Sequence, residues 1–134
     1  MITKIDHIGI AVSDLEQQIP FYRDILKLTF LEIKEVSEQK VKIALFQIGD
    51  INLELLEPTS QSSPIAKFIE KRGEGLHHIA YRSDEIINEI EFLKENNIVM
   101  IDNEPRIGIH ESKIAFINPK SSGKVLTEIC QITK

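Results

Sequence analysis

The chain has 134 residues, of which 42% are hydrophobic, and its formal net charge is -5. This length can bury a hydrophobic core without disulfides, and the single cysteine, Cys130, excludes an intrachain one. The acidic balance argues against a nucleic-acid or membrane-surface partner, because both select a basic excess. No apolar run is long enough to span a membrane, and the first residues lack the apolar stretch of a signal peptide, so we expect a cytoplasmic protein.

The first part of the chain is predicted to form one strand, one helix and three further strands. Ser13 stands three residues before Glu16, the spacing of a capping box, so we expect a helix to follow it. Pro20 removes a backbone donor from this helix, which predicts a kink there or a helix that begins near it. Gly49 and Asp50 have the residue types of a two-residue hairpin turn. The strands are predicted at residues 5–12, 29–36, 41–48 and 51–57.

A polar connector over residues 57–64 is followed by a short predicted helix. Ser63 and Pro64 are typical of a helix start, and Gly73 of a helix end. The remaining residues again predict a strand, a helix and three strands. We expect Ser83 or Asp84 to cap the second of these helices, and strands near residues 98–101, 113–118 and 125–132.

The two halves resemble each other at an offset of 71 residues. This offset carries His7-Ile8-Gly9 onto His78-Ile79-Ala80, Phe21 onto Phe92, and IALF at 43–46 onto IAFI at 114–117. We therefore predict an α+β fold of two tandem βαβββ modules. They form one domain over residues 1–134, with module one at 1–57, a connector and helix at 58–74, and module two at 75–134.

The repeat also pairs Glu54 with Glu128, since each lies in an apolar closing strand about fifty residues after its histidine. A buried carboxylate needs a proton, a cation or several donors. Two histidines and two carboxylates, one pair from each module, are therefore predicted to form a divalent metal site from His7, Glu54, His78 and Glu128. The alternatives are structural histidines, and glutamates that pair with a nearby lysine or arginine. His77 would face away from His78, because neighbouring side chains of a strand alternate.

These residues give the sequence a resemblance to the vicinal oxygen chelate superfamily, which comprises glyoxalase, bleomycin resistance and dioxygenase proteins. Within it, IDHIGIAVSDLE at 5–16 and SPIAKFIEKRGEGLHHIA at 63–80 resemble the methylmalonyl-CoA epimerase family. The resemblance implies an open, partly barrel-like mixed sheet, the same four metal ligands, a cofactor such as Co, Ni, Mn or Zn, an acyl-CoA substrate and a homodimer.

The implied reaction is an isomerase reaction, the epimerisation of methylmalonyl-CoA by removal and return of the α-proton through a metal-stabilised enolate. Some epimerases have a glutamate base at the position of Ile43, so Glu54 and Glu128 are our candidates for the two bases. The resemblance also assigns substrate binding to Lys120 and Ser121. Coenzyme A phosphates could be attracted by a basic set comprising Lys40, Lys113, Lys120, Lys124 and Arg106.

Other functions share this ligand set or this fold. A glyoxalase I-like lactoylglutathione lyase would use the same four ligands and also move a proton. A drug-binding resistance protein of the same fold would have no catalytic role, but such members generally lack a complete ligand set. A ring-cleaving dioxygenase is disfavoured because its iron site typically uses two histidines and one carboxylate. Comparing turnover of methylmalonyl-CoA with turnover of the glutathione hemithioacetal would distinguish the epimerase from the lyase.

Overall fold

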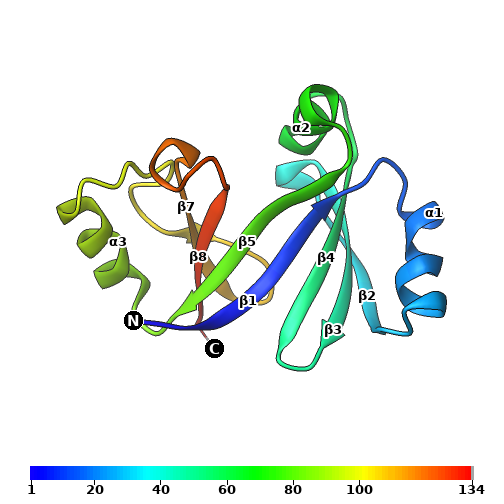
Figure 1. The fold of residues 1–134 in the computed structure, drawn as a ribbon, viewed down its shortest axis with the longest axis horizontal. Helices are drawn as coiled ribbons and strands as arrows, with labels where there is room; N and C mark the ends of the chain where they lie inside the picture. The colour runs from blue at the N-terminus through cyan, green and yellow to red at the C-terminus, as the bar shows by residue number, and fades with distance from the viewer. Residues whose placement is uncertain (134) are drawn as a thin grey trace. The chain divides into compact units, whose positions relative to one another are not determined.

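The computed structural model describes residues 1–133 and divides into two compact units (Figure 1). The N-terminal unit is His7–His77. The C-terminal unit is Met1–Asp6 together with the residues from His78 onward. The boundary therefore falls between Asp6 and His7 on one strand and between His77 and His78 on another. No helix among residues 1–133 is both long and apolar enough to cross a membrane.

The N-terminal unit contains one βαβββ module. Its strands lie in the order β2-β3-β4-β1, with β1 parallel to β4 and the other pairs antiparallel. The elements are β1 (Ile2–Ala11), α1 (Leu15–Pro20), β2 (Thr29–Val36), β3 (Val41–Ile48), β4 (Ile51–Pro58) and α2 (Pro64–Arg72). A π-helical turn (Phe21–Ile25) and a 3-10 turn (Ser37–Gln39) complete it. The predicted hairpin at Gly49 and Asp50 joins β3 to β4.

The C-terminal unit contains the second module, in the strand order β5-β8-β7-β6. Strands β5 and β8 are parallel, whereas β7 pairs antiparallel with both β8 and β6. Its elements are β5 (Gly75–Ser83), α3 (Ile86–Glu95), β6 (Arg106–Ile107), β7 (Ser112–Ile117), a 3-10 turn (Pro119–Ser121) and β8 (Thr127–Ile132). The two modules confirm the predicted α+β fold.

Helix α2 begins and ends where its sequence predicts. The Ser63 hydroxyl accepts a hydrogen bond from the Ile65 N–H at 3.2 Å, and Pro64 is the first helical residue. Gly73 ends the helix with a φ of 79°, a backbone conformation that side chains with a Cβ rarely adopt. Each end of the helix thus has a local chemical cause.

Helix α1 departs from the prediction at its start and agrees with it at its end. The side chain that caps it belongs to Asp14, which accepts from the Glu16 N–H at 2.9 Å, so the expected capping box at Ser13 is wrong. The Ser13 N–H instead donates to the Glu74 carboxylate at 2.7 Å. Pro20 has no N–H to continue the α-helical pattern, and the chain changes there to the π-helical turn. The irregularity expected at Pro20 is therefore present.

Helix α3 also has a different start from the one we predicted. The Ser83 hydroxyl accepts a hydrogen bond from the N–H of Glu85 at 3.1 Å. Glu85 is the residue just before the helix, so Ser83 stabilises the turn that leads into α3 but does not cap it. The Ile86 N–H donates to the side-chain oxygen of Gln131 at 2.8 Å. A residue distant in sequence thus supplies part of the cap.

The strand predicted at residues 98–101 is wrong. Met100 makes one isolated bridge with Ile117, and the edge strand beside β7 is instead β6. Ile98 and Met100 pack into the hydrophobic core beneath α3. The segment still contacts β7, since the Ile101 N–H donates to the Phe116 carbonyl at 2.8 Å and the Asn118 N–H donates to the Val99 carbonyl at 2.9 Å, but this pairing is limited to the single bridge.

Each unit buries one face of its strands against its own helix. In the N-terminal unit α1 covers the β3 and β4 side chains of Ala44, Phe46, Leu53 and Leu55. In the C-terminal unit α3 covers Ala115, Ile117 and Ile129. Because side chains alternate along a strand, the intervening residues lie on the other face, which we call the inner face of each unit.

The register of the strands repeats between the units. Both Glu54 and Glu128 are paired with a residue two positions after the module's histidine, and with a residue of the preceding antiparallel strand. The matched pairs are Gly9–Glu54 with Ala80–Glu128, and Leu45–Glu54 with Phe116–Glu128. Identical registers put His7 with Glu54, and His78 with Glu128, at equivalent places on the two inner faces.

Candidate metal centre

The N-terminal unit brings His7 and Glu54 together on its inner face. His7 lies on β1 and Glu54 on the parallel strand β4, with Glu54 beside Gly9 in register. The His7 Nε2 and Glu54 Oε2 atoms are 3.7 Å apart. Both residues are buried, at 8% and 6% exposure, although each carries a polar group that costs free energy to remove from water.

The C-terminal unit contains an equivalent pair. His78 lies on β5 and Glu128 on β8, and their Nε2 and Oε1 atoms are 3.4 Å apart. Their exposures are 5% and 4%. The predicted equivalence of the two histidines and of the two glutamates is therefore present in the geometry of each unit taken by itself.

The donor atoms of each pair suit a shared divalent ion. Ligand bonds of about 2.1 Å, at angles between a right angle and the tetrahedral angle, place two donor atoms about 3.0–3.4 Å apart. The observed separations of 3.4 and 3.7 Å are at or slightly beyond this range. Imidazole nitrogens with carboxylate oxygens are ligands for Co, Ni, Mn and Zn, so the residues present fit such a metal.

The inner face around Glu54 is aliphatic. Ile43, Leu45 and Leu56 are buried on it, and Ile43 pairs with Leu56 in the β3–β4 register. None of these side chains can accept a proton. Ile43 therefore contributes no base, and on the neighbouring strand β2 the charged residues Lys34 and Glu32 are the register partners of Ile43 and Leu45.

The equivalent surface of the C-terminal unit is different, because it has aromatic and charged residues. The Phe116 ring stands edge-on to the His78 imidazole, with 5.7 Å between ring centres. Cys130 occupies the position that corresponds to Leu56, and Arg82 is its register partner on β5. The two modules therefore share their histidine–glutamate pairs but not the groups around them.

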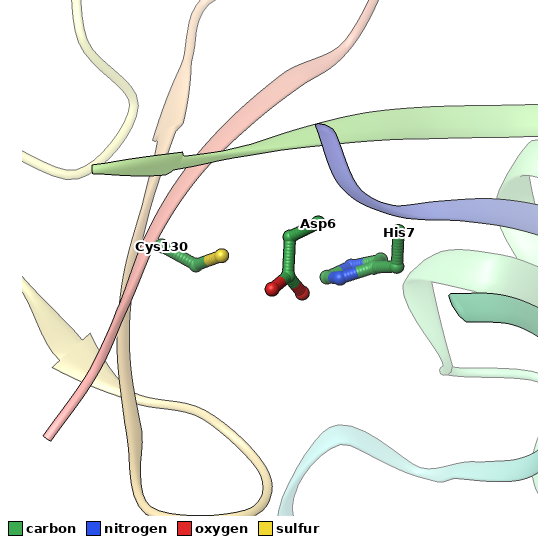
Figure 2. Close-up of side chains that lie close together, drawn as sticks. All are labelled: Asp6, His7 and Cys130. Carbon is green, nitrogen blue, oxygen red and sulfur yellow. The ribbon is translucent and has the colours of Figure 1, made fainter. Parts of the chain in front are cut away.

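Asp6 joins this charged set within the C-terminal unit. Its Oδ1 accepts hydrogen bonds from Arg82 Nε at 2.9 Å and from Arg82 Nη2 at 2.6 Å. Figure 2 shows the Asp6 carboxylate turned towards the Cys130 sulfur. Burial, followed by the negative charges of Asp6 and Glu128, raises the pKa of the Cys130 thiol far above its usual range. Cys130 is therefore a neutral buried thiol rather than a nucleophile.

His77 lies apart from the inner-face pairs, as its position beside His78 predicts. It packs edge-on against the Phe68 ring of α2, with 4.8 Å between ring centres. Burial lowers its pKa to about 4, so the imidazole is neutral near pH 7. His77 is thus a packing residue of the N-terminal unit.

Lys120 and Ser121 lie in the 3-10 turn between β7 and β8. The Lys120 N–H donates to the Asn118 side chain at 2.9 Å, and the lysine side chain is exposed. The Ser121 hydroxyl accepts from the Val99 N–H at 2.9 Å. The turn is fixed by these bonds, and a substrate-binding role for the two residues stays a prediction.

Sequence reasoning missed Phe116, Asp6 and Arg82 as neighbours of the candidate site. The 71-residue offset could have identified Phe116, since it falls on Leu45 beside Glu54. The Asp6–Arg82 pair had no such signal, because the offset carries Asp6 onto His77, which makes different contacts.

The strand order, the registers and the histidine–glutamate pairs define one class of protein. Residues 6–116 match the model of the glyoxalase/bleomycin resistance protein/dioxygenase superfamily, and the chain belongs to this family of vicinal oxygen chelate proteins.

Among its relatives are epimerases of acyl-CoA thioesters. The ethylmalonyl-CoA/methylmalonyl-CoA epimerase of Cereibacter sphaeroides is 34% identical over 134 residues, which covers 98% of this chain and 100% of that one. A methylmalonyl-CoA epimerase solved with methylmalonyl-CoA and NH4+ has a TM-score of 0.92 and 35% identity, covering 98% of this chain and 95% of that one. A Streptomyces coelicolor methylmalonyl-CoA epimerase variant solved with 2-nitronate-propionyl-CoA also has a TM-score of 0.92, 35% identity and the same 98% and 95% coverage.

Proposed function

We propose that the chain is a metal-dependent epimerase that interconverts the two epimers of methylmalonyl-CoA. The observation that carries the proposal is the repeated histidine–glutamate pair, 3.7 Å apart in one unit and 3.4 Å in the other, at identical strand registers. Similarity over nearly the whole chain to epimerases of methylmalonyl-CoA supports this substrate. Ethylmalonyl-CoA, named for the Cereibacter relative, is a second substrate to compare.

In this proposal His7, Glu54, His78 and Glu128 hold one divalent ion between them. When bound, the ion supplies positive charge that stabilises the negative charge developing on the thioester and carboxylate oxygens of the substrate. The ion would also add positive charge beside the two buried carboxylates. Loss of either pair should therefore weaken metal binding as well as turnover.

Epimerisation requires proton transfer at both faces of the α-carbon, so the enzyme needs two groups that exchange protons. We propose Glu54 and Glu128 for these roles, with one removing the α-proton and the other returning one to the opposite face. The aliphatic side chain of Ile43 leaves Glu54 as the candidate base of the N-terminal unit. Lys120, exposed in its turn, would attract the coenzyme A phosphates, with Ser121 beside it.

The test is α-proton exchange in heavy water, followed by NMR with methylmalonyl-CoA in the presence and absence of a chelator. We expect exchange that is lost with the chelator and restored by Co, Ni, Mn or Zn. A protein with bound metal that catalyses no exchange would contradict the proposal. The glutathione hemithioacetal should not turn over; if it were the better substrate, the chain would be a lyase of the glyoxalase type.

Glu54→Gln separates the role of base from that of ligand, because glutamine keeps an oxygen donor but cannot take up a proton. At a metal concentration that saturates the weakened site, we expect proton exchange to fall by at least about 100-fold, a typical contribution of general acid–base catalysis. Undiminished exchange with metal retained would exclude Glu54 as a base. Glu91→Gln, on the exposed side of α3, removes the same charge away from the pairs and is the matched control.

We further propose that the protein is a homodimer. Strand β2 is an edge strand, and its Leu31 and Ile33 side chains are exposed at 47% and 50%. A second copy would remove such apolar side chains from water. Sedimentation equilibrium distinguishes the two states, and a monomer at micromolar concentration would contradict this part of the proposal.

A further inference from the structure

Arg106 is a cation beside the candidate metal centre that the proposed mechanism does not use. It lies on the short edge strand β6 and forms an ion pair with Asp102, in which Arg106 Nε and Asp102 Oδ1 are 3.2 Å apart. The other oxygen of Asp102 accepts the Phe116 N–H at 2.8 Å. Asp102 thus attaches the arginine to the main chain of β7. All these residues belong to the C-terminal unit.

A chain of two ring contacts leads from the guanidinium of Arg106 to the metal-binding histidine of the same unit. The Arg106 Cζ atom lies 5.5 Å from the centre of the Phe116 ring, within the range of a cation–π contact. The same ring stands against His78. Phe116 pairs with Glu128 in register, so its ring is on the inner face that carries His78 and Glu128.

The guanidinium has hydrogen-bonding capacity left for an anion. It has five N–H donors, and the pair with Asp102 uses the Nε side. The side chain is 46% exposed, so its Nη groups can be reached from solvent. The Phe116 ring removes water from one face of the guanidinium, which strengthens its attraction for a planar anion lying in the plane of the guanidinium.

The anion best suited to this position is a carboxylate. Phosphates of an extended coenzyme A lie at the far end of the pantetheine arm, whereas the guanidinium is separated from His78 by one aromatic ring. The group next to the reacting carbon that has the right charge and planarity is the free carboxylate of the acyl chain. Guanidinium and carboxylate also match in a two-bond geometry that a lysine cannot form.

We infer that Arg106 binds the free carboxylate of the acyl group and so selects 2-carboxyacyl thioesters over simple acyl thioesters. The inference rests on the proposed function and names the feature of the substrate that this site recognises. It also separates Arg106 from the lysines of the predicted basic set, whose role would be to attract phosphates. Asp102 acts as a positioning residue, since it holds the guanidinium against Phe116.

The test compares two ligands that differ only in this carboxylate. Binding of methylmalonyl-CoA and of propionyl-CoA is measured by titration calorimetry on the metal-loaded protein, for the original chain, Arg106→Leu and Arg106→Lys. We expect Arg106→Leu to weaken binding of methylmalonyl-CoA by about 10- to 100-fold, the value of hydrogen bonds to a charged group. Propionyl-CoA should change by less than about twofold, and Arg106→Lys should lie between the other two proteins.

Arg23→Leu is the matched control, because Arg23 forms an exposed ion pair with Asp24 at 2.8 Å in the other unit. It should bind both ligands as the original chain does. Equal weakening of both ligands by Arg106→Leu would show that Arg106 contacts the coenzyme A part, and unchanged binding of both would remove it from the site. Either result overturns the inference.

Failure of the proposed function would be recognised separately. In that case the original chain would catalyse no α-proton exchange, whatever the binding measurements give. If exchange is present and Arg106→Leu raises KM for methylmalonyl-CoA with little change in kcat, Arg106 contributes binding that the ground state and the transition state share. A folding defect is excluded if Arg106→Lys unfolds at the temperature of the original chain.

Discussion

Removal of the metal should lower the free energy of unfolding by an amount that depends on how tightly the four proposed ligands bind it. At a free metal concentration 100 times the dissociation constant, a ligand that binds only the folded state adds about 2.7 kcal/mol of stability. The unfolding entropy of a chain of this size is about 0.3 kcal/mol/K, so this stabilisation corresponds to a rise in Tm of about 10 °C. The two closely spaced donor pairs, both buried, are the structural basis for expecting tight binding.

Replacing one ligand carboxylate tests that reasoning. Changes to outer partners of metal ligands already weaken binding by about 10- to 100-fold, so Glu128→Gln should weaken it by at least about 100-fold. At the same metal concentration the stabilisation falls to about 0.4 kcal/mol, a rise in Tm of only one or two degrees, roughly. Glu54→Gln should weaken metal binding to a similar extent, because Glu54 has the same strand register in the N-terminal unit as Glu128 has in the C-terminal unit.

The assay is differential scanning calorimetry of the metal-free protein with increasing Co or Zn, carried out on the original chain, both variants and the Glu91→Gln control. The reasoning is refuted if either ligand variant keeps the full rise in Tm with metal. It is also refuted if Glu91→Gln loses the rise, since that residue lies on the exposed side of α3.

Three further predictions concern the core, a helix cap and the thiol. Phe46→Ala should lower the free energy of unfolding, measured in urea, by about 3–5 kcal/mol, because Phe46 is fully buried between the Tyr22 and Phe30 rings. A loss of less than about 0.5 kcal/mol, as for an exposed residue, would contradict this prediction. Ser63→Ala should cost about 1 kcal/mol through loss of the α2 cap, while Ser63→Asp should retain most of it. Cys130 should resist alkylation at pH 8 in the folded protein and react once unfolded. Because its pKa is raised on folding, the stability that the neutral thiol contributes is complete below the ordinary thiol pKa of 9.0 and declines above it, and Cys130→Ala should remove that decline.

Local chemistry made several elements predictable. The Gly49-Asp50 turn and the Ser63, Pro64 and Gly73 signals of α2 act over a few residues, so the sequence carries their full cause. The equivalence of Glu54 and Glu128 could also be found, because a duplicated module repeats its strand register along with its sequence.

Other features depended on residues distant in the chain. Residues 98–101 alternate as a strand would, but only Ile98 and Met100 enter the core under α3 and the segment makes a single bridge to β7, which further along pairs with Arg106 and Ile107. Gln131 supplies a cap to α3 from the last strand. The Arg106–Phe116–His78 contacts depend on that edge pairing, and no spacing in the sequence indicates them.

The matched registers also bear on how such a chain could have arisen and then specialised. A single module contributes one imidazole and one acid, so an ancestral half-length chain would have needed a second copy of itself to complete the proposed set of four ligands. Once the halves are fused, each can mutate independently. The aliphatic neighbours of Glu54 on β3 and β4, and the aromatic and charged neighbours of Glu128, are differences of the kind that such independent change produces.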